Sequence, residues 1–455
     1  MNEYAGQTIV VVGAGDSGRS LARFFLGKGA RTILSERRPR TQLADLDELE
    51  TAGVILDCGG HSVPLFTAAD LVVVSPGVPQ EIAPIQAAMQ RGVPVLGEVE
   101  IARRELTAPL IGITGTNGKS TVTTLIGEML RRWGQRTFVG GNLGTPLIEA
   151  VDQSWDWLVV ELSSFQLEAI RRFRPDYGLL LNLSADHLDR YPDMTSYRAA
   201  KLRLFENMTA EDIAVLNADD PEVAAVATDL AAQTVWFSSR RLLPQGMGID
   251  QGEIVWRWQG AEQRFVAAEL QIGGQHNLEN VMAALIPPLL AGCPAATAWQ
   301  AATLFTGLPH RMQLLGERGG VRWYDDSKGT NVGSVVKSLE GLAAPVTLIA
   351  GGKDKQGDLM PLTVPIAAKV ETLVLIGEAA ERMAAAFAGL TRIERAGSME
   401  AAVAVAARLT PAGGSVLLSP GCSSFDMFRD YRERGERFAA AFRNLPVTDE
   451  GRHGD

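Results

Sequence analysis

The residues with the clearest chemical potential stand together in the segment Gly115-Thr116-Asn117-Gly118-Lys119-Ser120-Thr121. Glycines allow backbone N–H groups to converge on phosphate oxygens, a lysine ammonium reaches the terminal phosphates, and a Ser or Thr hydroxyl can bind Mg²⁺. The strict phosphate-loop spacing has a further glycine at the position where this chain has Ile113. The segment is therefore a variant phosphate-binding loop, and we expect it to hold ATP.

Two further side chains could act beside such a loop. Glu161 follows the apolar residues 157–160, and a carboxylate at a strand end is well placed to hold Mg²⁺. The alternative is that Glu161 offsets the dipole of the next helix. Lys201 lies in a helical segment, residues 198–205, and its sequence context alone predicts an ordinary solvated charge.

Other polar residues allow two interpretations each. His187 lies between Asp186 and Asp189 after an apolar run, so it could bind a metal or phosphate, or be structural. Asn277 and Asn280 open a helical segment, so their amides could bind a base or ribose, or cap the helix.

A second glycine turn lies near the start of the chain. A buried strand, residues 8–12, leads into Gly13-Ala14-Gly15-Asp16-Ser17-Gly18, then a helix at 19–28 and a strand at 31–35 that ends at Glu36. This pattern is typical of a dinucleotide-binding βαβ unit with an acidic residue on a ribose. The alternative is a glycine turn that only lets helix and strand pack closely. Two nucleotide-type turns point to a nucleotide-bearing substrate as well as ATP.

The elements that must position these residues repeat the order strand, loop, helix. We expect an α/β protein of three domains, at residues 1–95, 96–306 and 307–455. The short β-type runs at 233–270 predict an antiparallel extension of the middle sheet.

Bulk composition agrees with three domains and excludes several classes of protein. The chain has 455 residues, 46% of them hydrophobic and 21% charged, with a net charge of −10, which argues against a nucleic-acid-binding surface. Three widely spaced cysteines fit a reducing compartment, and no apolar stretch is long enough to span a membrane. We expect a cytoplasmic, monomeric protein.

Several motifs together resemble the Mur ligase family in order and spacing. They are the loop at 114–121, Glu161-Leu162-Ser163-Ser164-Phe165, Asp186-His187-Leu188-Asp189, His276-Asn277-x-x-Asn280, Pro309-His310-Arg311 and Asp326-Ser327-Lys328-Gly329-Thr330-Asn331. Within that family, the runs at 163–168 and 419–426 are most similar to the branch that adds D-glutamate to UDP-N-acetylmuramoyl-L-alanine. The resemblance covers nearly the whole chain.

The resemblance implies a Rossmann-like UDP-binding domain, a central phosphate-loop domain with a mainly parallel sheet, and a Rossmann-like amino-acid-binding domain. The UDP-muramoyl substrate would contact Asp16, Ser17, Glu36, Arg37, Gly77, Asn142, Ser163 and Gln166. ATP would contact Gly115, Asn117, Gly118, Lys119, Ser120, Thr121, Asn277, Asn280, Arg311 and Asp326. D-Glutamate would contact Lys328, Thr330, Lys355, Ser424, Phe425 and Tyr431.

The resemblance also implies the chemistry. The alanine carboxylate would be phosphorylated by ATP, and the D-glutamate amine would attack the acyl phosphate. Two Mg²⁺ ions would be held by Ser120, Glu161, His187 and Lys201, the lysine as a carbamate, and the catalytic group would comprise Lys119, Glu161, His187, Lys201 and Arg311. The alternatives are a Mur-type or folylpolyglutamate-type ligase with another amino acid, and an NAD-dependent dehydrogenase that uses the first glycine turn.

Overall fold

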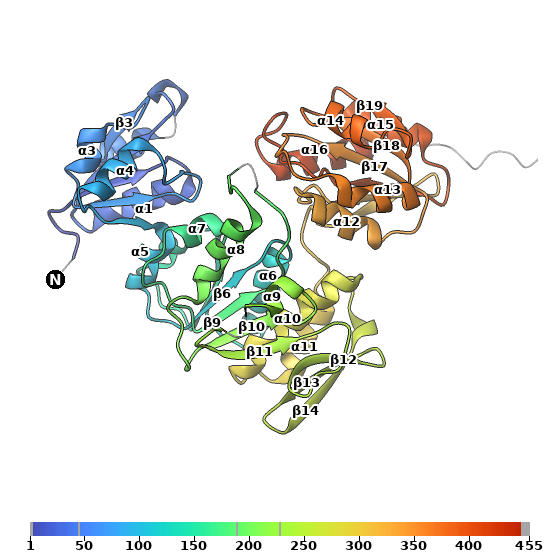
Figure 1. Ribbon diagram of the computed structural model, residues 1–455, viewed down its shortest axis with the longest axis horizontal. Coiled ribbons are helices and arrows are strands. Elements are labelled where there is room, and N and C mark those ends of the chain that lie inside the picture. Colours follow the sequence, from blue (N-terminus) through green and yellow to red (C-terminus); the bar gives the residue numbers. More distant parts are fainter. Residues whose placement is uncertain (1–2, 44–45, 188–189, 227–228, 447–455) are drawn as a thin grey trace, which may run out of the picture. The chain divides into compact units, whose positions relative to one another are not determined.

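The computed structural model contains three β-sheets, each covered by helices (Figure 1), and describes residues 3–43, 46–187, 190–226 and 229–446. The chain falls into two compact units. The first unit comprises residues 1–183, 198–267 and 280–302 and carries two of the sheets. The second unit comprises residues 184–197, 268–279 and 303–455 and carries the third sheet.

The first sheet has the strand order β3-β2-β1-β4-β5, and all its pairings are parallel. Its strands are β1 (Thr8–Val12), β2 (Arg31–Glu36), β3 (Ile55–Cys58), β4 (Leu71–Val74) and β5 (Val95–Gly97). The helices are α1 (Asp16–Gly27), α2 (Asp47–Ala52), α3 (Val63–Thr67), α4 (Ala83–Gln90) and α5 (Glu98–Glu105). The strand order reverses between β1 and β4, which is where open parallel sheets bind their ligands.

The second sheet has nine strands in the order β14-β13-β12-β11-β10-β9-β6-β8-β7. They are β6 (Leu110–Thr114), β7 (Thr137–Gly141), β8 (Trp157–Glu161), β9 (Tyr177–Leu180), β10 (Ile213–Asn217), β11 (Gln233–Phe237), β12 (Gly246–Asp250), β13 (Glu253–Trp258) and β14 (Ala261–Val266). Only β12, β13 and β14 pair antiparallel. The expectation that residues 233–237 belong to the antiparallel extension is wrong, because β11 pairs parallel with β10.

Helices and 3-10 turns connect and cover this sheet. The helices are α6 (Lys119–Arg132), α7 (Ser164–Glu168), α8 (Met194–Leu202), α9 (Pro221–Ala224), α10 (Gln275–Leu290) and α11 (Ala295–Leu304), and the 3-10 turns include η3 (Leu147–Ala150) and η4 (Arg203–Phe205). β6 lies between β8 and β9, so the loop that follows it is flanked by the ends of two parallel strands.

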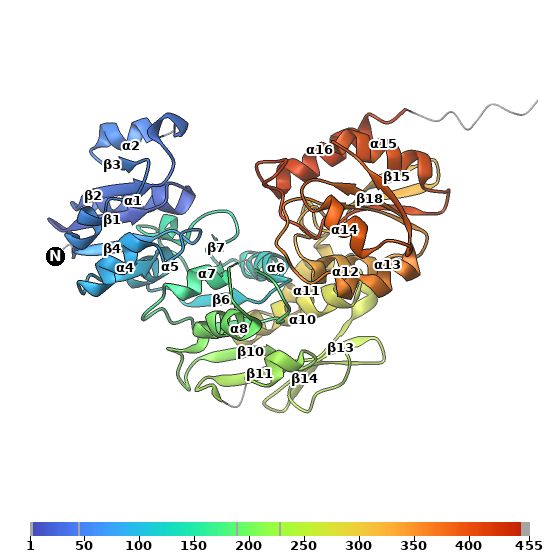
Figure 2. The same cartoon turned by 45° about the horizontal axis from the view of Figure 1, so that its top comes forward.

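The third sheet has the order β15-β16-β20-β17-β18-β19 and is parallel except for its first pair. Its strands are β15 (Gln313–Arg318), β16 (Val321–Asp325), β17 (Val346–Gly351), β18 (Val370–Ile376), β19 (Arg392–Arg395) and β20 (Ser415–Leu418). The helices, seen from a second direction in Figure 2, are α12 (Val332–Glu340), α13 (Thr363–Lys369), α14 (Ala380–Ala386), α15 (Met399–Leu409) and α16 (Tyr431–Arg443).

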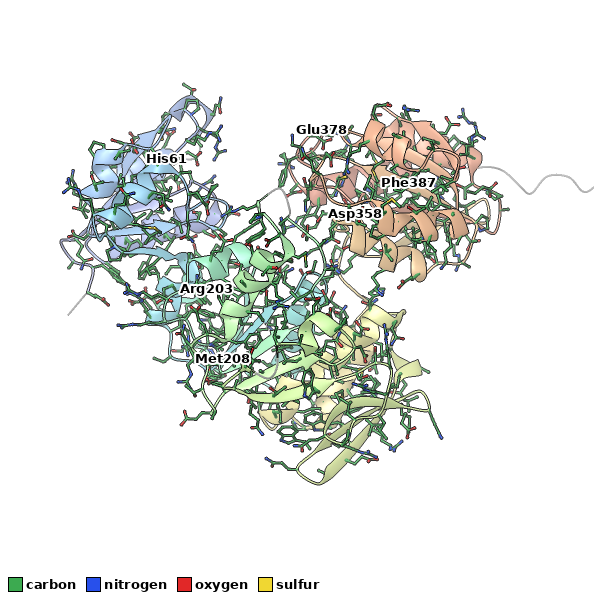
Figure 3. The ribbon with its side chains drawn as sticks, viewed as in Figure 1. His61, Arg203, Met208, Asp358, Glu378 and Phe387 are labelled. Carbon is green, nitrogen blue, oxygen red and sulfur yellow. The ribbon has the colours of Figure 1, made fainter. Side chains whose placement is uncertain are left out.

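Continuous apolar runs form the middle of each sheet, as expected for strands covered on both faces. Val10, Val73 and Ile111 are fully buried, and so is Phe387, which belongs to the core of the second unit (Figure 3). The predicted three-domain α/β architecture is confirmed. None of the described helices is long and apolar enough to cross a membrane.

Candidate active site

The loop between β6 and α6 has the backbone of a phosphate cradle. Gly118 caps α6 in the left-handed region, at φ +88°, where a side chain would be strained. A Cβ there would also lie 2.3 Å from the Asn280 Oδ1 atom. Glycine is therefore required at this position, and Asn280 lies against the loop as the family resemblance leads one to expect.

Two lysine side chains meet on one carbonyl group of this loop. Lys119 donates its Nζ hydrogens to Gly115 O at 2.8 Å and Thr116 O at 2.9 Å. Lys201 donates to the same Gly115 O at 2.8 Å and is only 2% exposed. The interpretation of Lys201 as a solvated charge is therefore wrong, since this amine reaches the loop from inside the protein.

The loop is braced by a residue that the sequence did not single out. The Asn182 side chain accepts the Asn117 N–H at 2.8 Å and donates to Asn117 O at 3.0 Å, and its backbone carbonyl accepts the Thr116 N–H. An asparagine just after an apolar strand carries no specific signal in a single sequence. Its reciprocal hydrogen bonds nonetheless fix the loop to the end of β9.

Glu161 lies at the tip of β8, 2% exposed, and meets the first turn of α6. Ser120 Oγ donates to Glu161 Oε2 at 2.6 Å, and Asn142 Nδ2 donates to Glu161 Oε1 at 2.6 Å. The hydroxyl and carboxylate oxygens form the hard donor set that Mg²⁺ prefers, and Mg²⁺ normally uses only one or two protein carboxylates. The residues present therefore fit a nucleotide-bound Mg²⁺ ion, although the described residues hold no cluster of three or more His, Cys, Asp or Glu side chains arranged for a metal.

Several predicted contact residues also have structural partners. Ser163 and Gln166 form a capping box on α7, which explains their types without any ligand. Asn277 Nδ2 donates to Gly273 O at 2.9 Å, which ties α10 to a residue just before its start but is not an N-cap, because an N-cap side chain accepts a backbone N–H. At Ser163 and Gln166, capping and ligand binding remain compatible.

The first glycine turn is tightly packed in the way that the pattern predicts. A Cβ on Gly18 would lie 1.8 Å from Gly13 O. Glu36, at the end of β2, accepts the Ala14 N–H at 2.9 Å and is bound by the Arg38 backbone and guanidinium. Burial opposes ionisation of this carboxyl, but these hydrogen bonds prevail and lower its pKa to about 2. Asp16, Arg37 and Gly77 are exposed near this turn, and Ser17 is half-buried.

In the second unit, Asp186 joins two segments of the third-sheet region. Asn331 Nδ2 donates to Asp186 Oδ2 at 3.0 Å, and Lys355 Nζ lies 3.3 Å from Asp186 Oδ1. His187 Nε2 lies 3.6 Å from the same carboxylate, and its backbone is left-handed at φ +54°. Asp189, the other predicted neighbour of His187, lies outside the described residues.

Four of the predicted amino-acid contacts, Lys328, Thr330, Ser424 and Phe425, lie on the two loops that follow β16 and β20, whereas Lys355 lies on the loop after β17. Lys328 Nζ lies 5.2 Å from the centroid of the Tyr431 ring, a cation–π contact. Ser424 is buried, whereas Phe425 is 72% exposed. A cation, a hydroxyl and an uncovered aromatic ring are suitable groups for an acidic amino acid.

One guanidinium holds these two loops together. Arg434 of α16 is fully buried and donates to Ser327 Oγ at 3.0 Å, Ser327 O at 2.7 Å and Cys422 O at 3.1 Å. Burial lowers the pKa of this guanidinium to about 10. The arginine stays charged at neutral pH and fixes the loop after β16 to the loop after β20.

Two predicted ATP contacts lie beside these loops in the second unit. The buried Arg311 Nε has no hydrogen-bond partner among the described residues. Asp326 accepts hydrogen bonds from Ser338 Oγ and Ser419 Oγ, both at 2.7 Å, and its burial raises its pKa to about 6. The fold therefore uses Asp326 to tie α12 and β20 together.

The first unit thus brings Lys119, Ser120, Glu161, Lys201 and Asn280 together around one loop. In the second unit, Lys328 lies against Tyr431, on a loop that Arg434 joins to the loop before Ser424. Family models match this chain: the Mur ligase MurD-like N-terminal domain covers residues 7–97, the Mur ligase middle domain 113–287, and the Mur ligase glutamate ligase domain 310–422. The chain belongs to the Mur ligase family.

Curated relatives match over almost their whole length. A UDP-N-acetylmuramoylalanine--D-glutamate ligase from Syntrophotalea carbinolica is 62% identical over 446 residues, covering 98% of this chain and 99% of the relative. An enzyme of the same name from Geotalea daltonii is 50% identical over 450 residues, with coverage of 98% and 99%.

Solved structures share the fold at low sequence identity. The UDP-N-acetylmuramate-alanine ligase MurC from Thermotoga maritima has a TM-score of 0.59 at 18% identity, covering 96% of this chain and 99% of its own. MurF from Acinetobacter baumannii has a TM-score of 0.60 at 14% identity, with coverage of 97% and 92%. At these identities the likeness supports the three-domain fold alone.

Proposed function

We propose that this chain is an ATP-dependent amide ligase that joins D-glutamate to UDP-N-acetylmuramoyl-L-alanine in peptidoglycan precursor synthesis, with release of ADP and phosphate. The observation that carries the proposal is the buried pair of Ser120, which follows Lys119 in the first turn of α6, and Glu161, at the tip of β8. The full-length identity to the two D-glutamate ligases supports the choice of substrates.

The family is ATP-dependent and requires Mg²⁺ in general. We assign the phosphates to the loop at 115–121 and one Mg²⁺ to Ser120 and Glu161, whose oxygens suit it. Mg²⁺ bound there would neutralise charge on the phosphate groups. A second Mg²⁺ on His187 and a carbamate of Lys201 is a further part of the proposal, supported by the burial of Lys201 against the loop.

The ligation needs activation because a carboxylate is a poor electrophile. In the proposed sequence, the alanine carboxylate attacks the γ-phosphate of ATP, and the D-glutamate amine then displaces phosphate from the acyl phosphate. Lys119 and Arg311 would stabilise the negative charge of the transferred phosphoryl group. The unpartnered Arg311 Nε supports a role for this guanidinium in binding an anion.

The substrate-binding assignments follow the family. The nucleotide sugar is assigned to Asp16, Ser17, Glu36, Arg37, Gly77, Asn142, Ser163 and Gln166, and ATP also to Asn277, Asn280 and Asp326. D-Glutamate is assigned to Lys328, Thr330, Lys355, Ser424, Phe425 and Tyr431. The same proposal includes domain boundaries at 95/96 and 306/307, a monomeric state and a cytoplasmic location. The last strand of the first sheet, β5, continues two residues past the first of these boundaries, to Gly97.

One assay tests the reaction and the amino acid together. Purified protein receives ATP, Mg²⁺, UDP-N-acetylmuramoyl-L-alanine and one amino acid at a time, and phosphate release is followed. We expect release with D-glutamate and little with L-glutamate, L-lysine or diaminopimelate. Release with another amino acid and none with D-glutamate would reject the assignment, and NADH turnover would favour a dehydrogenase.

A further inference from the structure

The segment that leaves the first sheet is fastened to the second-sheet region at three nearly successive positions. We call Gly97, Glu98 and Glu100 the joint. The Gly97 N–H donates to Ala169 O at 2.8 Å, and a Cβ on Gly97 would lie 2.9 Å from the Ala169 Cβ. This close approach places the end of β5 directly on the segment that follows α7.

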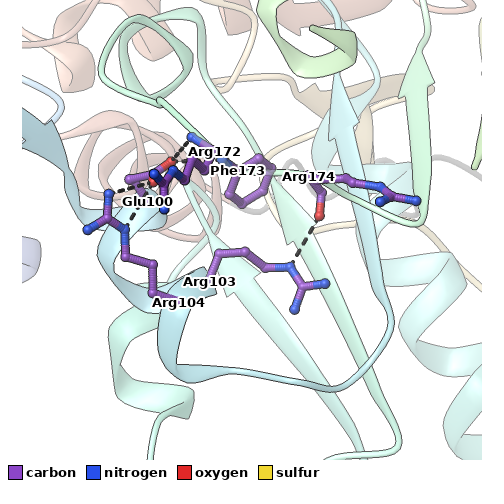
Figure 4. A pocket seen from close by; sticks show the side chains of 6 residues that line it. All are labelled: Glu100, Arg103, Arg104, Arg172, Phe173 and Arg174. Carbon is purple, nitrogen blue, oxygen red and sulfur yellow. Dashed lines mark hydrogen bonds and ion pairs between the residues drawn. The ribbon is translucent and has the colours of Figure 1, made fainter. Parts of the chain in front are cut away.

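Glu100 is the most heavily bonded member of the joint. Its carboxylate is 1% exposed and accepts the backbone N–H groups of residues 171–173 at 2.8, 2.9 and 2.8 Å. The Arg104 guanidinium adds two bonds, at 3.1 and 3.0 Å (Figure 4). Burial opposes ionisation, but these donors prevail and lower the pKa of Glu100. The joint is therefore held by a charged group whose hydrogen bonds are made within the fold.

Beside Glu100 lies a cavity of about 220 Å³ lined largely by arginines (Figure 4). Three of the four head groups are engaged: Arg103 donates to the Arg174 carbonyl at 3.1 Å, and Arg174 binds Asp212 at 2.7 and 3.0 Å. Arg104 is engaged by Glu100. These three arginines thus brace the joint.

Glu98 makes the connection that reaches the active site. It is 1% exposed, its Oε1 accepts the Ile148 N–H at 2.7 Å, and the nearby Leu147 N–H also favours its ionised form. Its Oε2 is buried with no hydrogen-bond partner among the described residues, and burial raises its pKa to about 7. A leucine at this position would avoid the cost of burying a carboxyl group. The carboxyl therefore contributes through its hydrogen bonding to the backbone N–H at the start of η3.

The turn before η3 leads from Glu98 to the metal-binding carboxylate. Gly141 N–H donates to Thr145 O at 2.8 Å and closes the turn, which Pro146 joins to η3. Within the turn, Asn142 donates to Glu161 twice, from its backbone N–H at 2.8 Å and from Nδ2 at 2.6 Å. Glu98 thus holds η3, which directly follows the turn, and Asn142 within the turn holds Glu161.

We propose that Glu98 is a positioning residue for phosphoryl transfer: by binding the first N–H groups of η3 it fixes the turn at 141–146 and keeps Asn142 on the Glu161 carboxylate. Glu98 itself contacts no substrate. The expected effect on kcat rests on the proposed function. The expected effect on the order of segment 141–150 can be measured by hydrogen exchange without any reaction.

The experiment compares Glu98→Leu with Glu98→Gln in the full-length protein. Leucine keeps the volume and removes the acceptor, whereas glutamine keeps an oxygen for the η3 N–H groups. Glu149→Leu is the matched control, because Glu149 lies on the same η3 turn with its side chain 44% exposed. We expect Glu98→Leu to lower kcat at least tenfold with KM for ATP within twofold, and Glu98→Gln to stay within threefold of wild type.

Two further readouts separate positioning from general destabilisation. In a double-mutant cycle, Glu98→Leu combined with Asn142→Ala should be no slower than Asn142→Ala alone, because both act on the same contact. Hydrogen exchange of segment 141–150 should be at least tenfold faster in Glu98→Leu and unchanged in Glu149→Leu.

Unchanged exchange of that segment, or rate losses that multiply in the double variant, would overturn the inference. Should Glu98→Leu fail to fold, Glu98→Asp, which keeps a carboxyl group but is one methylene too short to reach η3, replaces it with the same expectations. Wild-type protein without ligase activity would reject the proposed function, and the exchange measurement would still decide the inference.

Discussion

Replacing Glu161 by glutamine should separate the fold of the phosphate site from its chemistry. Ser120 Oγ and Asn142 Nδ2 each donate to this carboxylate at 2.6 Å. In Glu161→Gln, the amide oxygen can still accept from Asn142, and the amide NH₂ can donate to the Ser120 hydroxyl, which reverses its role. Both buried hydrogen bonds survive, while the negative charge is lost.

The magnitudes follow from these contacts. Two charge-assisted bonds worth about 1.5–3 kcal/mol each become neutral bonds worth about 0.5–1.5 kcal/mol each. The neutral amide is also easier to bury than a carboxylate, which offsets this loss, so we expect stability to change by less than about 1 kcal/mol. Loss of one preorganised electrostatic group in a closed site typically lowers kcat by about 10²–10³, or about 2.7–4 kcal/mol.

The assay measures phosphate release at saturating substrates and thermal melting with and without ADP and Mg²⁺. Glu128→Gln is the control, because Glu128 lies on the exposed side of α6, paired with Arg131. We expect Glu161→Gln to melt like wild type but to lose the extra stabilisation that Mg²⁺ adds to ADP. A variant that retained more than about a third of wild-type kcat would refute the assignment of Glu161 to the metal.

Three other outcomes are expected. Lys119→Ala should lower phosphate release at least about 10³-fold with an unchanged circular dichroism spectrum, and normal turnover would exclude a phosphate-loop role. Lys201→Ala should lose activity that high bicarbonate does not restore, and unchanged activity would contradict a required carbamate. Glu36 has its pKa lowered to about 2, so its contribution to stability is fully present above its unfolded pKa and is lost as pH falls from about 4.5 towards 2. The free energy of unfolding of Glu36→Gln should therefore be lower than that of wild type at neutral pH and should fall less steeply between about pH 4.5 and 2. Identical plots of unfolding free energy against pH for the two proteins would contradict this.

The sequence predicts the sheets well because their central strands are continuous apolar runs. Residues 8–12, 71–74 and 415–418 coincide with β1, β4 and β20. The direction of a strand is not encoded in its own pattern, which is why β11 was assigned to the antiparallel extension although it pairs parallel with β10. β15 was not predicted at all, since its mixed sequence becomes a strand only through pairing with β16.

The candidate site was predictable where chemistry needs a rare local pattern. Gly118, Lys119 and Ser120 satisfy that condition, and the structure gives them the backbone of a phosphate loop. Burial of an isolated polar residue is decided by distant segments, so neither the buried Lys201 nor the bracing Asn182 could be read from neighbouring residues. The same reason hides Glu98, whose partners are about 50 residues further along the chain.

The buried Arg434 has a consequence for the two loops to which we assign the amino acid. Because one guanidinium serves both the loop after β16 and the loop after β20, neither can shift without breaking its hydrogen bonds. Lysine, with a point charge in place of a planar fork, could not replace it. The loops that carry Lys328 and Ser424 therefore act as a rigid template of fixed spacing. An inhibitor aimed at this proposed site should be a rigid mimic of the amino acid. A flexible inhibitor would lose conformational entropy on binding, and the rigid loops cannot adapt to it to form compensating contacts.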